Sequence, residues 1–209
     1  MSFRFEEKII LHISDYFKIK SFLISSGGFQ LYPKRQISSL YFDNFDNEMY
    51  LSSEEGSLPR KKIRIRSYPS NINTANWFLE TKISSAEGRY KISKKIDKSD
   101  YESFLKKGFF DQYYGMCYPK IWVTYDREYY SFLNHRITLD QKVEYRCFKS
   151  SRTLNNFKDL IMEVKSNNTP SIDFFESKVP FQRVRFSKYC EGYNKLFNRN
   201  ENQRLSQIV

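Results

Sequence analysis

The sequence predicts an α+β domain that is mainly β, with its strands forming a barrel or a strongly curved sheet. Eight or nine short runs alternate between apolar and polar residues, which is the period of a strand. Three further stretches have helical periodicity. Hydrophobic residues make up 40% of the 209 positions, which is enough for a core and excludes a disordered basic tail.

The predicted strands are rich in β-branched and aromatic residues, and most of them show a period of two. They cover residues 3–11, 36–42, 61–68, 77–83, 89–96, 121–130, 136–146, 160–166 and 182–186.

Three helices are predicted by their apolar stripes and their end signals, over residues 15–25, 99–107 and 187–197. A Gly-Gly pair follows the first helix. In the second, Ser99 and Glu102 have the spacing of a capping box, and in the third Ser187 is a suitable N-cap.

We expect one domain over residues 1–197 and a polar C-terminal tail over 198–209, because no linker-like segment interrupts the chain. No apolar run approaches the roughly 20 residues of a transmembrane helix, and the N-terminus lacks the apolar segment of a signal peptide. Three scattered cysteines, an odd number, suit a reducing compartment. We therefore expect a cytoplasmic protein.

The chain carries a formal net charge of +11, which predicts a polyanionic partner. Strand alternation places Lys62, Arg64 and Arg66 on one face, opposite Ile63 and Ile65. Two cations ~6 Å apart repel by ~3 kcal/mol at an effective dielectric of 20, so such a row needs water or a bound anion. A closed barrel with cations inside and apolar residues outside meets this need and would form an anion tunnel.

Seven motifs follow one another from residue 4 to residue 193. They are Arg4-Phe-Glu6-Glu-Lys8, Leu40-Tyr-Phe-Asp43, Arg60-Lys-Lys-Ile-Arg64-Ile-Arg66, Phe78-Leu-Glu80-Thr-Lys82, Tyr125-Asp-Arg127 with Arg136-Ile-Thr-Leu-Asp140, Ile161-Met-Glu163-Val-Lys165, and Arg185-Phe-Ser187-Lys188-Tyr189. Their types and order resemble the VTC (vacuolar transporter chaperone) branch of the triphosphate tunnel metalloenzymes, a CYTH-like superfamily.

The resemblance implies an antiparallel eight-stranded closed barrel wrapped by helices. It also implies polymerisation of inorganic polyphosphate from ATP, with release of ADP and dependence on Mn²⁺ or Mg²⁺. ATP and inorganic polyphosphate are then the expected partners, and no nucleic acid is expected. Export of the product would need a membrane-protein partner, because the sequence has no membrane span of its own.

Carried over by position, the resemblance assigns both phosphate-binding and metal-binding residues. The basic triphosphate clamp consists of Lys8, Arg64, Arg66, Lys82, Arg127, Arg136, Arg185 and Lys188. Tyr125 and Ser187 are expected to hydrogen-bond phosphate, and the family's further lysine is Lys91, Lys94 or Lys95, of which we take Lys91. Glu163 is the expected metal ligand, with Glu6 as a second candidate.

The chemistry suits these residue types. Arginine grips phosphate oxygens bidentately and stays protonated, and a hard divalent cation prefers carboxylate oxygens. A terminal phosphate oxygen is already ionised at pH 7, so phosphoryl transfer to it needs no general base. This fits a chain with only two histidines.

Two other functions remain open from the sequence. A hydrolase of the same fold would need water activated by a metal or a carboxylate, with Glu6, Glu80 and Glu163 as candidates. A module or sensor that only binds polyanions such as polyphosphate or inositol polyphosphate would not need Glu163, so Glu163→Ala separates binding from catalysis. Stacking on nucleic acid is disfavoured because the aromatic residues fall mostly on strand faces opposite the cations.

Overall fold

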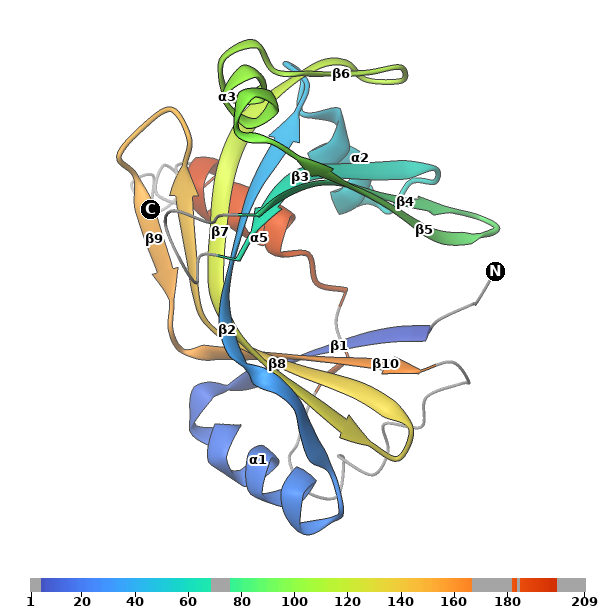
Figure 1. Ribbon diagram of the computed structural model, residues 1–209, viewed down its shortest axis with the longest axis vertical. Helices are drawn as coiled ribbons and strands as arrows, with labels where there is room; N and C mark the ends of the chain where they lie inside the picture. The colour runs from blue at the N-terminus through green and yellow to red at the C-terminus, as the bar shows by residue number, and fades with distance from the viewer. Residues whose placement is uncertain (1–4, 69–75, 167–181, 184, 199–209) are drawn as a thin grey trace, which may run out of the picture. The chain divides into compact units, whose positions relative to one another are not determined.

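The computed structural model describes residues 5–68, 76–166, 182–183 and 185–198 of the chain (Figure 1). These residues confirm the α+β class with a dominant, mainly antiparallel β-sheet. Arg4 of the first motif lies outside them. The α-helices are α1 (Tyr16–Ser25), α2 (Glu48–Glu55), α3 (Lys98–Lys107) and α5 (Lys188–Tyr193), and the strands are β1 (Phe5–His12), β2 (Phe29–Asp43), β3 (Arg60–Ser67), β4 (Trp77–Ser85), β5 (Gly88–Ile96), β6 (Phe109–Asp111), β7 (Gly115–Phe132), β8 (His135–Cys147), β9 (Thr153–Asn156), β10 (Asp159–Ser166) and β11 (Gln182–Arg183).

The sheet does not close among the described residues. Its strand order is β11-β1-β10-β8-β7-β2-β3-β4-β5, with β6 paired to β7 and β9 paired to β8. The end strand β5 is hydrogen-bonded to β4 on one side only, and its residues 89–95 are exposed. The expectation of an eight-stranded closed barrel is therefore corrected to an open sheet of eleven strands over the described residues.

The chain divides into two compact units, which we describe separately. Unit 1 comprises Met1–Gln36, Tyr125–Val143 and Asn155–Phe186, and unit 2 comprises Ile37–Thr124, Glu144–Leu154 and Ser187–Val209. The long strands β2, β7 and β8 contribute residues to both units. The predicted domain boundaries stay a prediction, and the predicted tail lies outside the described residues beyond position 198.

Unit 1 has its core between α1 and one face of its strands. Ile19 and Leu23 of α1 are buried against alternate residues of β1, β7, β8 and β10. In β10 these core residues are Met162 and Val164. Because successive strand residues point to opposite faces, Glu163 and Lys165 lie on the face away from α1.

A buried carboxylate fastens α1 to this core. Glu128 in β7 accepts hydrogen bonds from Tyr16 and Tyr130, each at 2.5 Å, and from Gln141 at 3.3 Å. Lys20 of α1 lies 3.3 Å from the same carboxylate. These contacts satisfy a charge that would be costly to bury alone, so Glu128 has a structural role.

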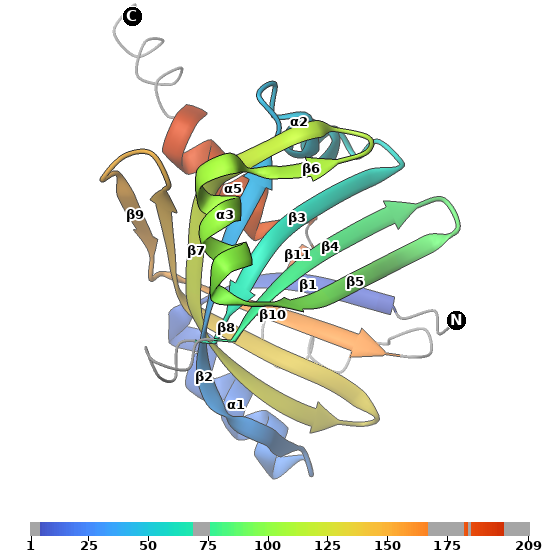
Figure 2. The ribbon, with the colours of Figure 1, turned by 45° about the horizontal axis from the view of Figure 1, so that its top comes forward.

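Unit 2 has its core under the faces of β2 and β3 that carry Leu40, Phe42, Ile63 and Ile65. Aromatic residues of α3 and its neighbours pack against this cluster, and Figure 2 shows α3 following β5 and leading into β6. The confirmed burial of Ile63 and Ile65 leaves Lys62, Arg64 and Arg66 on the opposite face, as strand alternation predicted.

Of the two helix caps predicted from the sequence, the structure confirms one and contradicts the other. The Ser187 hydroxyl accepts from the Cys190 amide at the start of α5, which confirms the predicted N-cap. The capping box at Ser99 is wrong, because α3 begins one residue earlier and Asp97 accepts from the Asp100 amide at 2.8 Å. A carboxylate at Asp97 is an equally strong cap and comes first along the chain.

Helix α2 was not predicted from the sequence, because its eight residues are too short and polar to show a clear apolar stripe. It is held by Asp43, whose carboxylate accepts from the amides of Asn44, Met49 and Tyr50 at 2.8–3.0 Å. The Tyr189 hydroxyl donates to the same carboxylate at 2.7 Å. The second and last motifs are therefore joined in unit 2 through a buried hydrogen-bond network.

The structure also bears on the expectations about a transmembrane helix and about the cysteines. Among the described residues, no helix has both the length and the hydropathy that crossing a bilayer requires. All three cysteines are free and buried.

Candidate functional site: two cationic clusters with buried carboxylates

Most of the residues assigned from the sequence gather in two clusters, one in each unit. The Glu163 cluster, in unit 1, consists of Glu6, Lys8, Tyr125, Arg127, Arg136, Asp140, Glu163 and Lys165. The Glu80 cluster, in unit 2, consists of Tyr41, Lys62, Arg64, Arg66, Glu80, Lys82 and Lys91.

Strand register sets the order of charges in the Glu163 cluster. Glu163 in β10 lies directly opposite Lys8 in β1 and Thr138 in β8. Two residues on, Lys165 lies opposite Glu6 and Arg136. Side chains of directly opposed residues are close enough to interact, so each row pairs one acid with one cation, and the second row also places Lys165 opposite the cation Arg136.

Glu163 is a buried carboxylate surrounded by cations. It is 7% exposed, and its Oε1 lies 2.8 Å from Lys165 Nζ while its Oε2 lies 4.0 Å from Arg127 Nη2. Burial alone would raise its pKa, but Lys165, Lys8 and Arg127 hold the pKa of Glu163 well below its usual range. The group is therefore ionised at neutral pH.

Arg127 is held in one orientation by Asp140. Its Nε donates to Oδ1 at 2.5 Å and its Nη2 donates to Oδ2 at 2.6 Å, and the guanidinium lies 5.2 Å from the Tyr125 ring centroid. Burial opposes its charge, but Asp140 raises the pKa of Arg127 well above its usual value. Asp140 was not predicted as a site residue, although it closes the motif that begins at Arg136.

Lys165 was also missed, and it joins two carboxylates. Its Nζ lies 2.8 Å from Glu163 and 3.7 Å from Glu6. Lys8 lies 3.4 Å from Glu6 and donates to the Phe186 carbonyl at 3.1 Å. The signal that could have found Lys165 is its place two residues after Glu163, on the same strand face.

The carboxylates of the Glu163 cluster fit a metal ion that takes few protein ligands. No group of three or more His, Cys, Asp or Glu side chains suited to a metal occurs in the described part of the chain. Glu6 and Glu163 nevertheless share a neighbour in Lys165. Mg²⁺ is usually held by one or two carboxylates together with water and substrate phosphates, so these two residues fit such an ion but not a complete protein cage.

In the Glu80 cluster, one buried carboxylate binds cations from β3 and β5. Glu80 is 4% exposed, and its Oε2 lies 2.8 Å from Arg64 Nε and 2.7 Å from Arg64 Nη2. Lys91 Nζ lies 2.5 Å from Oε1, and Arg66 Nε lies 3.8 Å from Oε2. Burial alone would raise the pKa of Glu80, but Arg64 and Arg66 lower it to about 2.

Register also places three lysines side by side across this cluster. Lys82 in β4 lies directly opposite Lys62 in β3 and Lys91 in β5. Directly opposed like charges are destabilising, so this row favours a bound anion. Among the three candidates for the family's further lysine, Lys91 is the one whose ammonium contacts Glu80, while Lys94 lies on the other strand face.

Tyr41 supports Arg64 and was not predicted. Its hydroxyl accepts from Arg64 Nη1 at 2.9 Å, and its ring stacks on Tyr189 with centroids 5.0 Å apart. Burial opposes ionisation of this phenol, but Arg64 and Arg66 lower the pKa of Tyr41. The sequence signal that could have identified Tyr41 is its position in the second motif, two residues before Asp43.

The last motif lies partly in each unit. Arg185, which is exposed, belongs to unit 1 beside Phe186, whose carbonyl accepts from Lys8. In unit 2 the Ser187 hydroxyl accepts from Lys62 at 2.9 Å, and Lys188 is the first residue of α5. Ser187 is therefore already a hydrogen-bond partner of the Glu80 cluster.

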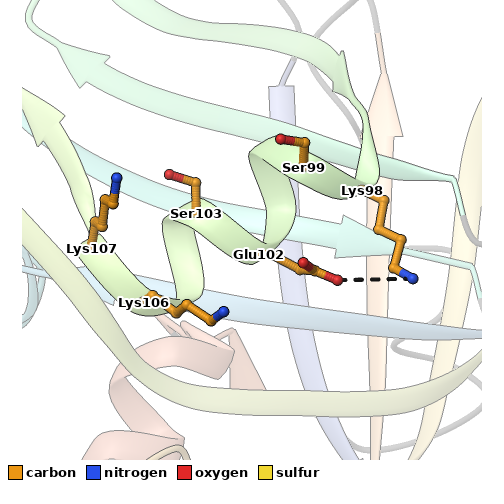
Figure 3. A pocket seen from close by; sticks show the side chains of 6 residues that line it. All are labelled: Lys98, Ser99, Glu102, Ser103, Lys106 and Lys107. Atoms are coloured by element: carbon orange, nitrogen blue, oxygen red, sulfur yellow. Dashed lines mark ion pairs between the residues drawn. The ribbon is translucent and has the colours of Figure 1, made fainter.

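A shallow open pocket lies elsewhere, on the surface of α3. Figure 3 shows that the side chains lining it all come from this one helix, with Lys98 and Glu102 paired at 3.9 Å. None of them belongs to either cluster.

A family model described as the VTC domain matches residues 3–197 of the chain. No match to this sequence was found among curated proteins.

Solved structures share the fold at low sequence identity. The putative adenylyl cyclase HpAC1 from Hippeastrum, reported to have a dominant triphosphatase activity, aligns with a TM-score of 0.61 and 14% identity over 91% of this chain and 95% of that chain. A putative adenylate cyclase from Bacillus halodurans aligns with a TM-score of 0.58 and 13% identity over 87% and 96%. A chain of the Schizosaccharomyces pombe Mediator head module aligns with a TM-score of 0.54 and 9% identity over 87% and 100%. These similarities show that the chain shares the fold of those structures, and they leave its activity open.

Proposed function

The chain belongs to the VTC family, and we propose from this that it is a metal-dependent polyphosphate polymerase. Its substrates are ATP and inorganic polyphosphate, and its products are ADP and a chain longer by one phosphate. The cation is Mn²⁺ or Mg²⁺. A cytoplasmic location and a membrane-protein partner for export belong to the same proposal.

The observation that carries the proposal is the ionised Glu163 among Lys8, Arg127 and Lys165. A site for a phosphate chain and its metal needs many cations around a carboxylate that stays charged in a buried position. The Glu163 cluster meets both requirements. The Glu80 cluster adds further cations oriented by a second ionised carboxylate.

In the proposed reaction, an oxygen of the terminal phosphate of the chain attacks the γ-phosphorus of ATP. A new P–O–P bond forms, the bond between the γ-phosphorus and the β–γ bridging oxygen breaks, and that oxygen leaves with ADP. The attacking oxygen is already ionised, so no residue has to remove a proton.

The protein therefore acts by orienting and neutralising phosphates. Asp140 fixes the plane of Arg127, and Glu80 with Tyr41 fixes that of Arg64, so both guanidinium groups are set before substrate arrives. When bound at Glu163, a divalent ion would neutralise charge on the phosphate oxygens.

The test is incubation of the protein with ATP and Mn²⁺, followed by analysis of the products on a polyacrylamide gel. We expect ADP and long polyphosphate. Arg64→Ala and Arg66→Ala should each lower product formation at least about tenfold, because each removes a charged phosphate donor. The matched control is Lys107→Ala, a charge loss on α3 outside both clusters, which should leave the rate unchanged. ADP with free phosphate alone would contradict polymerisation.

Hydrolysis of a triphosphate is the second candidate. It is favoured by the presence of two carboxylates, Glu6 and Glu163, in one cluster, because attack by water needs more activation than attack by phosphate. The products separate the two functions. A polymerase should convert ATP to ADP and long polyphosphate, whereas a hydrolase should release free phosphate from ATP or from tripolyphosphate.

A further inference from the structure

A second surface pocket, of about 470 Å³, lies in unit 2 where β7 meets the hairpin formed by β8 and β9. Sites for small molecules have volumes of roughly 300–1,000 Å³. Three kinds of side chain make up most of its lining: the aromatic residues Trp122 and Phe148, the cation Arg146, and the hydroxyl residues Ser150, Ser151 and Thr153. These residues lie outside both clusters, so the proposed reaction does not use them.

The pocket lies on the other face of the sheet from the Glu80 cluster. Trp122 and Phe148 pack against the hydrophobic cluster that contains Ile63. Arg64 follows Ile63 in β3 and therefore lies on the opposite strand face. A ligand in this pocket thus occupies a different site from phosphates bound at the Glu80 cluster.

Trp122 and Arg146 together offer a surface for stacking. The guanidinium carbon of Arg146 lies 5.7 Å from the centroid of the Trp122 ring. Trp122 is half-buried, whereas Arg146 is exposed, so the indole is a fixed support and solvent reaches the guanidinium. Nucleobases stack on aromatic rings and on the planes of guanidinium groups. The pair can therefore hold a planar heteroaromatic group.

The turn that joins β8 to β9 supplies donors for an anion (Figure 1). The Cys147 amide donates to the Arg152 carbonyl at 2.9 Å and closes the turn. The Ser150 hydroxyl accepts from the Arg152 amide at 3.4 Å, which leaves its own proton available to an acceptor. Ser151 is exposed beside it. Serine hydroxyls beside basic side chains are common donors to phosphate oxygens.

The cations around the pocket lack nearby carboxylates. Lys149 and Arg152 are exposed, and no carboxylate of the described residues lies within ion-pair distance of them or of Arg146. Lys120 adjoins the turn, because its carbonyl accepts from the Phe148 amide at 2.9 Å. Burial lowers the pKa of Lys120, and the nearby charge of Lys149 lowers it further. A bound anion would relieve this repulsion.

We propose that this pocket binds a nucleotide, with its base stacked on Trp122 and Arg146 and its phosphate held by the turn at residues 149–153. The aromatic surface and the basic turn lie side by side, which matches a ligand that carries a planar ring and a phosphate. A surface for single-stranded nucleic acid presents a series of aromatic residues for successive bases, whereas this pocket has one stacked pair. Binding here is independent of the proposed function, since neither cluster takes part.

The fluorescence of Trp122 tests the site directly. The chain has two tryptophans, and Trp77→Phe leaves Trp122 alone while it keeps an aromatic ring against Tyr101. This variant is titrated with AMP in the presence of EDTA and of excess tripolyphosphate, which fills any phosphate site in the two clusters. We expect saturable quenching. Ribose 5-phosphate and adenosine should each bind at least about tenfold more weakly, as measured by calorimetry, because each lacks one of the two recognised groups.

Arg146→Gln in the same background should lower the affinity for AMP about tenfold, because it removes a charge and a stacking plane. Arg146→Lys keeps the charge but not the plane, and we expect it to recover only part of the affinity. The matched control is Lys18→Gln, which removes an exposed charge from α1 in unit 1 and should bind AMP like the parent variant. Far-ultraviolet circular dichroism and the melting temperature establish that each variant is folded.

Four results would overturn the site: no saturable quenching by AMP, unchanged affinity in Arg146→Gln, an equal loss in Lys18→Gln, or ribose 5-phosphate binding as tightly as AMP. A single-stranded oligonucleotide that binds more than about tenfold more tightly than AMP would also overturn it, in favour of nucleic acid. These outcomes are separate from the polymerase assay. A protein that makes no polyphosphate can still bind AMP here, and an active polymerase can fail to.

Discussion

Lys165 lies close to two carboxylates of the Glu163 cluster. Its ammonium lies 2.8 Å from Glu163 and 3.7 Å from Glu6. A divalent cation that binds Glu163 must share these oxygens with Lys165 or displace it. At the residue scale, Lys165 is therefore expected to weaken metal binding while it strengthens phosphate binding.

Replacing Lys165 with methionine keeps the length of the side chain and removes its charge. We expect Lys165→Met to tighten Mn²⁺ binding at least about tenfold in the absence of nucleotide, because a close like charge is gone. Electron paramagnetic resonance of free Mn²⁺ measures this directly. Glu163→Gln should abolish the site, and weaker Mn²⁺ binding by Lys165→Met would show that Lys165 does not compete with the metal.

Glu80 makes a prediction about acid stability. Its pKa, near 4.5 in an unfolded chain, is lowered to about 2 in the folded protein, where burial opposes the charge but Arg64 and Arg66 favour it more strongly. The ionised group therefore stabilises the fold above about pH 4.5, and this stability is lost as the pH falls toward 2.

Glu80→Gln should therefore be less stable than the unchanged protein by about 2 kcal/mol at pH 7, because it leaves clustered cations without their carboxylate. Between pH 4.5 and pH 2 its unfolding free energy should fall less steeply. Urea unfolding across this pH range tests both statements. Glu102→Gln, on the surface of α3, is the control, and an acid slope equal to that of the unchanged protein would contradict the role of Glu80.

At the scale of elements, α5 lies very close to the strands beneath it in unit 2. A Cβ atom added at Gly192 would lie 2.5 Å from Tyr145 Cδ1 and 2.9 Å from Ile121 Cδ1. Both neighbours are fully buried and have little room to move. Gly192 is therefore required by the packing of the helix, although glycine is a poor helix former.

Gly192→Ala tests whether the packing requires glycine, because the substitution has two effects of opposite sign on the stability of the protein. Alanine favours an isolated helix by about 1 kcal/mol, whereas overpacking should destabilise the protein by about 1–3 kcal/mol. We expect a net loss of stability in urea unfolding. Glu191→Ala, one position earlier on α5, should have a smaller effect, and a stabilised Gly192→Ala variant would mean that α5 can move away from the strands.

At the scale of the whole molecule, the excess of cations makes stability depend on anions. The chain has a formal charge of +11, and both clusters contain more cations than carboxylates. An anion that binds only the folded state stabilises it by about 2.7 kcal/mol at a concentration one hundred times its dissociation constant. The Debye length is about 10 Å at 0.1 M salt, so exposed charges lose this interaction as salt rises.

Tripolyphosphate should therefore raise the melting temperature, and added KCl should reduce the increase. Differential scanning fluorimetry over a series of KCl concentrations measures both the increase in melting temperature and its reduction by salt. Sulfate at the same ionic strength is the control and should give a smaller shift. Equal shifts with both anions would show that the clusters do not recognise a chain of phosphates.

The fold alone does not decide the activity. The fold is shared with a putative adenylyl cyclase and with a chain of the Mediator head module, at 14% and 9% identity. What separates such proteins is the chemistry carried on the strand faces. In this chain that chemistry is two sets of cations, each organised by buried carboxylates.

Local sequence pattern was sufficient for the class of fold and for the faces of the strands. The alternation that put Lys62, Arg64 and Arg66 opposite Ile63 and Ile65 is a property of any extended backbone, so it could be predicted without a partner strand. The N-cap at Ser187 is local in the same way. The ordered motifs were enough to predict the family, which the match over residues 3–197 confirms.

Which side chains meet was decided only by the tertiary structure. Asp140 orients Arg127, Lys165 pairs with Glu6, and Arg35 lies over the ring of Tyr129, and each of these contacts joins residues of different strands. The open strand order, where the resemblance implied a closed barrel, is a fact of the same kind. Such contacts depend on strand order and register, which are set by long-range pairing, whereas alternation along a single strand records only the face on which each side chain lies.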